Sequence, residues 1–323
     1  MKNTGQRQKY SAFTGAVRSV CVPPASPLRS RIHAISANAA RSPMVHRMLA
    51  ALLLIGIPGV GAYAYFVEPT WLRVKRLTVL LSNLPLGLDG LRIVHLSDLH
   101  VGSEVPTWFL RQVVTTVQRL APDAIVLTGD FVHSRPEDAD GLTSILQDLH
   151  APHGAFAVLG NHDYAVNYSG DSSIPGVEEI VIAALERAGI TVLRNEETEI
   201  VAGRSRLQLY GIDELWSGRA QVSPLHESSS ALPRIVLCHN PDVVRFLPEQ
   251  NKDLVLCGHT HGGQVRIPPF RPPLTMTSDR RYWGGLSARG DGWVFVSRGI
   301  GYTWRVRLAA RPECVEITLR RGE

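Results

Sequence analysis

The sequence predicts an α/β domain built on two packed β-sheets. From residue 74 onward, short apolar runs alternate with stretches of helical periodicity, and later runs follow one another with fewer helices between them. The chain has 323 residues, of which 44% are hydrophobic and 20% charged. That is enough for one α/β domain of about 250 residues with an extension, and it excludes a disordered or collagen-like protein.

The extension begins with a basic arm at residues 1–48, which is rich in Ser, Pro, Ala and Arg and has no apolar period. We expect it to be disordered or to act in targeting. Residues 1–67 carry eight basic and no acidic side chains, so residues 68–323 have a net charge of −3. A nucleic-acid partner is therefore not expected, because it would need a basic face on the folded domain.

An apolar segment follows at residues 49–67, where 19 consecutive positions are uncharged and mostly apolar. About 20 such residues cross a bilayer, and the glycines with Pro58 disfavour a helix buried in a soluble core. We predict a transmembrane segment or signal anchor, and Ala62-Tyr63-Ala64 leaves cleavage open. The basic arm predicts a single-pass protein of the inner membrane with its domain on the outer, periplasmic face, although Arg73, Lys75 and Arg76 argue the other way.

Within the domain at residues 74–320, apolar runs predict nine strands and helical periodicity predicts four helices. Pro106 precedes the first helix and Gly189 follows the third, as is usual at helix ends. Residues 263–292, rich in Gly, Pro and Arg, predict a long surface loop. The strands are expected at Leu77–Leu81, Leu91–His95, Ala124–Leu127, Ala155–Leu159, Leu207–Tyr210, Arg234–Leu237, Asp253–Leu256, Trp293–Val296 and Val315–Leu319, and the helices at Thr107–Leu120, Asp138–Leu149, Val177–Ala188 and Pro241–Leu247.

Five polar clusters lie at or just after the ends of predicted strands. Because the carboxyl ends of neighbouring parallel strands meet at one edge of a sheet, these clusters should form one site. Two of the five follow a predicted strand directly, two follow after one residue, and the first follows after two. The clusters are Asp98-Leu99-His100, Gly129-Asp130, Gly160-Asn161-His162-Asp163, Cys238-His239-Asn240 and Gly258-His259-Thr260-His261.

The side chains in these clusters are suited to holding metal ions. Carboxylates, an amide oxygen and imidazoles without a thiolate favour Mn, Fe, Zn or Co over a closed structural zinc site. Seven ligands suit two ions that share a bridging carboxylate, and two ions about 3.5–4 Å apart are the usual arrangement for displacement at phosphorus. The seven candidates are Asp98, His100, Asp130, Asn161, His239, His259 and His261.

The order D-x-H, G-D, G-N-H-D, H and G-H-x-H resembles that of the calcineurin-like metallophosphoesterase superfamily, over about residues 74–320. The stretches LRIVHLSDLHVGS, GHTHGGQV and VSRGIG look most like its bacterial membrane-anchored phosphodiesterase branch. The resemblance implies a four-layer α/β/β/α sandwich with a dinuclear site at the rim of the two sheets.

The resemblance also implies a role for each residue. One ion would be held by Asp98, His100, Asp130 and His261, with Asp130 bridging to a second ion held by Asn161, His239 and His259. His162 would be a catalytic imidazole beside the phosphate. Asp163 would orient that imidazole, or it would serve only in the turn.

The implied reaction is hydrolysis of a phosphodiester or pyrophosphate by a metal-activated hydroxide. A protein phosphatase is disfavoured, because Gly129-Asp130 is followed by Phe131-Val132-His133 where those enzymes carry a further Asp-Arg-Gly. One alternative is an enzyme like the UDP-2,3-diacylglucosamine pyrophosphatase of lipid A synthesis, which would require the domain to face the cytoplasm. Another is a catalytically inactive membrane-bound binding module, which is disfavoured because no ligand is missing. The sequence leaves the choice among Mn, Fe and Zn and the oligomeric state open.

Overall fold

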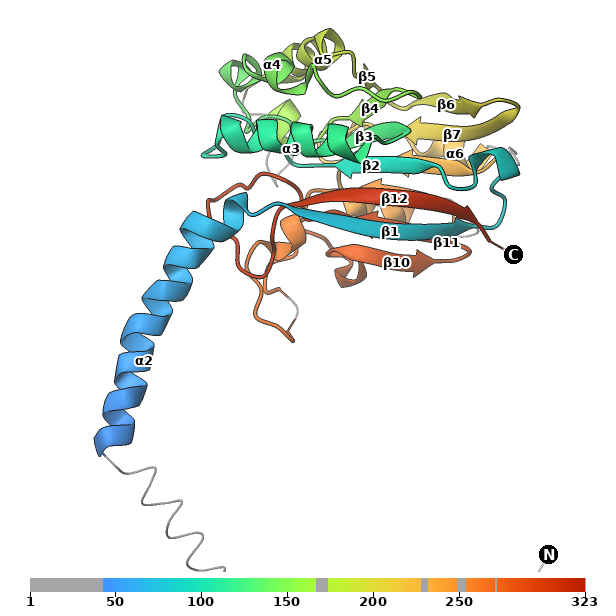
Figure 1. Cartoon of the computed structure of the whole chain (residues 1–323). Helices are drawn as coiled ribbons and strands as arrows, with labels where there is room; N and C mark the ends of the chain where they lie inside the picture. Colours follow the sequence, from blue (N-terminus) through green and yellow to red (C-terminus); the bar gives the residue numbers. More distant parts are fainter. Residues whose placement is uncertain (1–42, 167–173, 228–231, 249–253, 271, 323) are drawn as a thin grey trace, which may run out of the picture. The chain divides into compact units, whose positions relative to one another are not determined.

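The computed structural model describes residues 43–166, 174–227, 232–248, 254–270 and 272–322 (Figure 1). The chain divides into two compact units, Met1–Pro58 and Gly59–Glu323. Most of the predicted basic arm, residues 1–42, lies outside the described residues, so its predicted disorder stays a prediction.

The predicted apolar segment is helical. Helix α2 (Pro43–Ala62) continues into a π-helical turn, η1 (Tyr63–Val67), and a 3₁₀ turn, η2 (Glu68–Thr70). Along the part of the chain that the structure describes, no helix combines the length and the apolar character needed to cross a membrane. The structure therefore does not support the predicted transmembrane segment at residues 49–67.

The first sheet has six strands in the spatial order β1-β12-β2-β3-β4-β5. Strands β2, β3, β4 and β5 run parallel, whereas β12 is antiparallel to β2 and parallel to β1. The strands span β1 Arg73–Leu81, β2 Arg92–Leu96, β3 Ala124–Thr128, β4 Ala155–Val158, β5 Thr191–Val192 and β12 Glu313–Arg321.

The second sheet also has six strands, in the order β10-β11-β9-β8-β7-β6. Its central strands β11, β9, β8 and β7 run parallel, and an antiparallel strand closes each edge. The strands span β6 Glu196–Ala202, β7 Ser205–Gly211, β8 Arg234–Leu237, β9 Leu254–Cys257, β10 Gly285–Arg289 and β11 Gly292–Val296.

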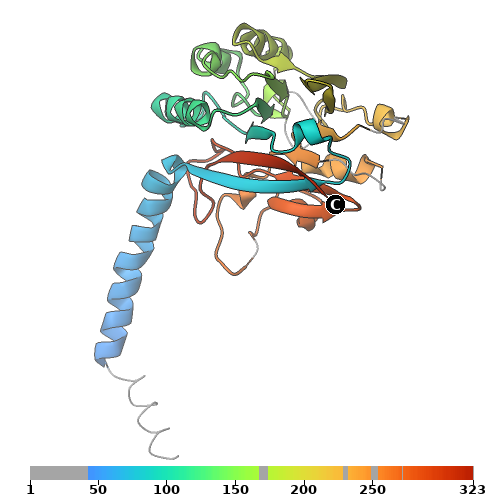
Figure 2. The same cartoon turned by 45° about the vertical axis from the view of Figure 1, so that its right-hand side comes forward.

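Alternate residues of each strand point to opposite faces of its sheet, so each sheet can bury one apolar face. The two sheets pack these faces against each other. Ile93 and Val126 of the first sheet share a buried core with Leu237 and Leu256 of the second. The other face of the first sheet packs against helices α3 (Thr107–Leu120), α4 (Leu142–Leu146) and α5 (Val177–Arg187), drawn green to olive in Figure 2. This arrangement confirms the α/β class with two packed sheets.

The outer face of the second sheet is covered by one short helix and two 3₁₀ turns. Leu225 of helix α6 (Ser223–Glu227), Val243 of the 3₁₀ turn η6 (Pro241–Phe246) and Tyr282 of η8 (Arg280–Tyr282) pack on it. The remaining 3₁₀ turns are η3 (Leu86–Leu88), η4 (Pro136–Ala139), η5 (His162–Tyr164) and η7 (His261–Gly263).

All nine predicted strands are present, within a few residues of their predicted ends. Strands β5, β6 and β10 were not predicted, because a short or edge strand such as β6, with the sequence EETEIVA, lacks a buried apolar run. The predicted loop at residues 263–292 in fact contains β10, which pairs with β11. Helix α4 is shorter than the predicted Asp138–Leu149, and the predicted helix at Pro241–Leu247 is a 3₁₀ turn.

Candidate functional site

The five polar clusters meet at the carboxyl ends of the parallel strands. Asp98 and His100 follow β2, Asp130 follows β3 and Asn161 follows β4. From the second sheet, His239 follows β8, and His259 and His261 follow β9. All seven predicted ligands are buried, with 6% or less of their surface exposed.

The first group of ligands is Asp98, His100, Asp130 and His261, whose candidate ligand atoms all lie within 4.8 Å of one another. The Nε2 atoms of His100 and His261 are 3.1 Å apart. His100 Nε2 is 3.6 Å from Asp130 Oδ2, and His261 Nε2 is 3.5 Å from Asp98 Oδ1. One carboxylate or imidazole atom from each residue thus points to a common centre.

The second group is Asp130, His239 and His259. His239 Nε2 is 3.1 Å from Asp130 Oδ2 and 3.2 Å from His259 Nδ1. Asn161 donates from Nδ2 to the carbonyl oxygen of Val166 at 3.0 Å, which leaves its Oδ1 as the atom available for a ligand. Asp130 belongs to both groups, as a bridging carboxylate would.

Two observations show that these residues fit divalent ions. Asp98 Oδ2 and Asn161 Oδ1 are buried without a hydrogen-bond partner, and such an atom costs about 1–3 kcal/mol unless something binds it. Five ligand residues also have positive φ angles, which non-glycine residues keep mainly at functional sites: Asp98 55°, His100 48°, Asp130 54°, His259 70° and His261 49°.

The charges in the cluster are strongly coupled. Burial would raise the pKa of Asp130, but the imidazoles around it, His239 first, hold that pKa well below its usual value. Burial would likewise lower the pKa of His239, but Asp130 and Asp98 outweigh it and raise the pKa to about 10. Burial lowers the pKa values of His100 and His261, so both are neutral at pH 7, the form in which an imidazole binds a metal ion.

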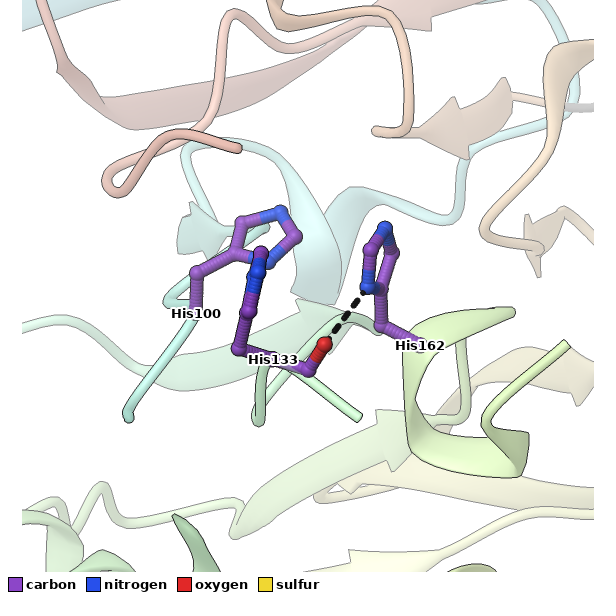
Figure 3. A group of neighbouring side chains, drawn as sticks. All are labelled: His100, His133 and His162. Atoms are coloured by element: carbon purple, nitrogen blue, oxygen red, sulfur yellow. Dashed lines mark hydrogen bonds between the residues drawn. The ribbon is translucent and has the colours of Figure 1, made fainter. Parts of the chain in front are cut away.

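His162 lies beside the first group, with its ring centroid 4.8 Å from that of His100 (Figure 3). Its Nδ1 is 2.9 Å from the carbonyl oxygen of His133 and 2.9 Å from Ser134 Oγ. Because a carbonyl oxygen only accepts, Nδ1 carries the proton, and Nε2 is the atom left for a substrate. The ring thus lies beside the candidate ligands, and its catalytic role stays a prediction.

His133 is a residue of this site that the sequence did not assign. Its ring stacks on that of His162 at 5.4 Å, and its Nδ1 has no hydrogen-bond partner. His100, His133 and His162 also bring candidate ligand atoms within 4.8 Å of one another. The sequence signal that could have pointed to His133 is its place three residues after Asp130, in the stretch that differs from the protein phosphatases.

Asp163 does not take the orienting role that was one of its two predicted roles. Its Oδ1 accepts from the backbone amides of Phe131, at 2.7 Å, and Val132, and its Oδ2 accepts from that of Gly160, at 2.8 Å. The backbone carbonyl of His133 serves the imidazole instead. Asp163 therefore fastens the turn after β4 to the turn after β3, which is the alternative role.

A second unassigned contribution comes after β7. Glu214 accepts hydrogen bonds from the backbone amides of Trp216, at 2.9 Å, and Ser217. This turn holds the Trp216 ring edge-on to His259, with ring centroids 4.5 Å apart. Glu214 thus positions an aromatic wall next to a predicted ligand.

The site opens into a cavity of about 620 Å³. The polar groups that line it include Asp130, Asn161, His162 and His259. Its apolar lining, here called the apolar wall, includes Val265, Leu274, Met276 and Trp304. A ligand here would meet both the metal-binding groups and the apolar wall.

The comparisons with known proteins agree with this geometry. The family model for calcineurin-like phosphoesterase matches residues 91–263. Phosphodiesterase YaeI of Escherichia coli (strain K12) is 34% identical over 262 residues, covering 80% of this chain and 92% of YaeI. UDP-2,3-diacylglucosamine pyrophosphatase LpxG of Chlamydia trachomatis serovar D is 31% identical over 301 residues, covering 78% of this chain and 90% of LpxG.

A third relative, the uncharacterized metallophosphoesterase YkuE of Bacillus subtilis (strain 168), is 31% identical over 281 residues, covering 84% of this chain and 95% of YkuE. Each match spans most of both proteins. The chain belongs to the calcineurin-like phosphoesterase family and is a metal-dependent phosphoester hydrolase.

Proposed function

We propose that this protein hydrolyses a phosphodiester or a pyrophosphate at a dinuclear metal site. The observation that carries the proposal is the position of Asp130, which is shared by two groups of converging ligands with the imidazole of His162 beside them. One ion would be held by Asp98, His100, Asp130 and His261, and the other by Asp130, Asn161, His239 and His259.

Each part of the site has a defined task in this reaction. Two divalent ions, of Mn, Fe or Zn, would supply hydroxide near neutral pH and neutralise charge on the phosphoryl oxygens. His162 presents Nε2 to the cavity and, when protonated, can donate to the leaving oxygen. The carbonyl of His133 holds the ring in that orientation.

The lining of the cavity supports a diester or pyrophosphate over a phosphoprotein. Among the described residues, no lysine or arginine lines it, so the arginine that binds phosphate in protein phosphatases has no counterpart there. Two relatives are named a phosphodiesterase and a pyrophosphatase.

The other functions are less well supported. The apolar wall favours a lipid-bearing substrate such as UDP-2,3-diacylglucosamine as the second candidate. An inactive binding module is disfavoured, because all seven predicted ligands lie together. Anchoring in the inner membrane through residues 49–67, with the domain on the outer face, stays a prediction that rests on the apolar run and the charge asymmetry of the sequence.

The test uses the full chain, with metals removed and then restored one at a time. Hydrolysis of bis-p-nitrophenyl phosphate and of p-nitrophenyl phosphate is measured side by side. Metal-dependent hydrolysis that favours the diester supports the proposal. A preference for the monoester would replace it with a phosphatase function.

Asp130→Asn should abolish activity and lower the metal content together, because the change affects both ions. Asp148→Asn on the surface is the matched control. Activity of Asp130→Asn within a few-fold of wild type would remove Asp130 from the bridging position.

A further inference from the structure

A set of large apolar side chains stands exposed beside the mouth of the cavity. We call this set the apolar rim. Soluble proteins rarely expose several such side chains together unless the surface binds something. The members and their exposed fractions are Ile267 66%, Phe270 70%, Leu274 61%, Met276 46% and Trp304 70%.

The apolar rim is one surface although its members come from two segments. Val265 pairs with Leu308, and Gln264 Nε2 donates to the carbonyl oxygen of Trp304 at 3.1 Å. These contacts place the loop of residues 264–276 next to residues 303–308. Figures 1 and 2 show the first segment as an orange loop that projects from the body of the domain.

The apolar rim borders the metal site directly. Leu274, Met276 and Trp304 are members of the rim and also line the cavity. On its other side Trp304 shares a second hollow with Tyr65 and Arg305, and the neighbouring Phe66 is 65% exposed. The exposed apolar surface therefore continues from the projecting loop to the aromatic pair at residues 65 and 66.

The charge of the same surface is positive. In residues 262–270, 272–278 and 301–312, the part of these segments that the structure describes, the partly exposed charged side chains are Arg266, Arg305 and Arg311, and no acidic residue occurs there. Arg305 lies 5.3 Å from the centre of the Tyr65 ring, and Arg266 lies 4.7 Å from that of Trp283. Glu104 is an acidic neighbour at the edge, where it accepts from the Tyr65 hydroxyl at 3.4 Å.

We propose that the apolar rim docks on a lipid bilayer that carries anionic headgroups, and that this holds the mouth of the active site at the membrane surface. Trp and Tyr favour the interface between lipid and water, large aliphatic and Phe side chains enter the acyl region, and arginines attract anionic headgroups. An amphiphilic phosphoester could then reach the metal site without leaving the bilayer. The inference rests on surface chemistry alone and requires neither a membrane-spanning segment at residues 49–67 nor the proposed reaction.

The test places a fluorescent reporter on the rim of the full-length protein. Phe270→Cys is made in a Cys21→Ser background and labelled with an environment-sensitive dye, because the other three cysteines are buried. Trp108→Cys on α3, where the native side chain is 60% exposed, is the matched control. The vesicles are phosphatidylcholine with or without phosphatidylglycerol.

With phosphatidylglycerol vesicles, the dye at position 270 should shift to the blue and lose emission to nitroxide groups on the lipid acyl chains. The dye at position 108 should do neither. The shift should weaken without the anionic lipid and at high salt. Equal responses at the two positions would overturn the proposal, even if residues 49–67 bind the vesicles.

A second variant tests the surface without a label. Ile267→Ser with Phe270→Ser should reduce co-sedimentation with the vesicles relative to Trp108→Ser. It should leave hydrolysis of the soluble bis-p-nitrophenyl phosphate unchanged, because neither residue lines the cavity. A blue shift without vesicles, together with a doubled mass in light scattering, would assign the rim to a second copy of the chain instead.

Discussion

Asp130 is the residue that the two groups of candidate metal ligands share. It is 2% exposed, its φ is positive, and its Oδ2 lies 3.1 Å from His239 Nε2 and 3.6 Å from His100 Nε2. A carboxylate in this position compensates the imidazolium of His239 when ions are absent and can bridge two ions when they are present. The same atoms thus stabilise the metal-free protein and prepare it to bind metal.

The charge on His239 predicts that metal uptake releases a proton. In the metal-free protein the pKa of His239 is raised from 6.5 to about 10, so the ring is protonated at pH 8 and must lose its proton to become a ligand. A raised pKa also stabilises the metal-free fold fully below pH 6.5, and this stability is lost as the pH rises through about 10. Isothermal titration of metal at pH 8, in two buffers of different ionisation enthalpy, should show release of about one proton from this group. Heats that do not depend on the buffer would contradict the prediction.

His162 and Ser134 separate catalysis from positioning. His162→Ala should keep the metal content and reduce kcat by ~10²–10⁴-fold, the usual contribution of general acid–base catalysis. Ser134→Ala should cost much less, because the carbonyl of His133 still accepts from Nδ1. Metal analysis with kcat measurement checks both variants. Loss of metal from His162→Ala would make His162 a ligand instead.

At the scale of the elements, the site is built from turns that follow parallel strands. The turn after β3 approaches the turn after β4 so closely that a Cβ on Gly129 would lie 2.5 Å from the backbone nitrogen of Gly160. Asp163 adds hydrogen bonds between the same two turns. The ligands are therefore positioned by backbone contacts between neighbouring elements, and a change in one turn should be felt in the next.

Gly129→Ala tests this close approach, with Gly218→Ala as its matched control. Gly129 has φ of 76° and Gly218 has φ of 75°, so both substitutions cost about 1–2 kcal/mol of backbone strain. At Gly218 nothing lies within 4 Å of the new Cβ, whereas at Gly129 it would also lie 2.8 Å from His239 Nδ1. Only Gly129→Ala should lose metal affinity and most of its activity, as measured by titration and hydrolysis. Equal losses of metal affinity and activity in the two variants would show that backbone strain, and not the close approach at Gly129, causes the effect.

At the scale of the whole molecule, the candidate metal site lies between the two sheets. Asp98, His100 and Asp130 follow strands of the first sheet, and His239 and His261 follow strands of the second. Below the site, the sheets are held together by an apolar core. Ions bound between the sheets would therefore link them at the edge where the core ends.

Removal of metal should consequently destabilise the whole domain. An ion that binds only the folded state adds about 2.7 kcal/mol at a concentration of 100 times its Kd. Chelation should lower the melting temperature in calorimetry and speed hydrogen exchange at the ends of both β3 and β8. Asp130→Asn should show a much smaller effect of chelator. Faster exchange confined to one sheet would contradict a link between the two.

The sequence by itself determined the elements whose signal is local. Helix α3 has its predicted bounds, Thr107–Leu120, because apolar residues recur at helical spacing and Pro106 precedes it. The predicted ligands could be named because each follows an apolar strand, and the sheets bring those strand ends together. The predicted membrane segment shows the limit of such reasoning, because an apolar run at residues 49–67 is not matched by a helix able to cross a bilayer among the described residues.

Only the tertiary structure decided features that depend on partners distant in the sequence. Edge strand β6 is defined by its pairing with β7, because its own sequence has no run of buried apolar residues. Asp163 lies 32 residues from Phe131, and no local pattern shows that its carboxylate binds that amide instead of the neighbouring imidazole. The apolar rim likewise arises where residues near 270 meet residues near 304. Periodicity reports which face of an element is buried, but which side chains meet in space is set by how the sheets and loops pack.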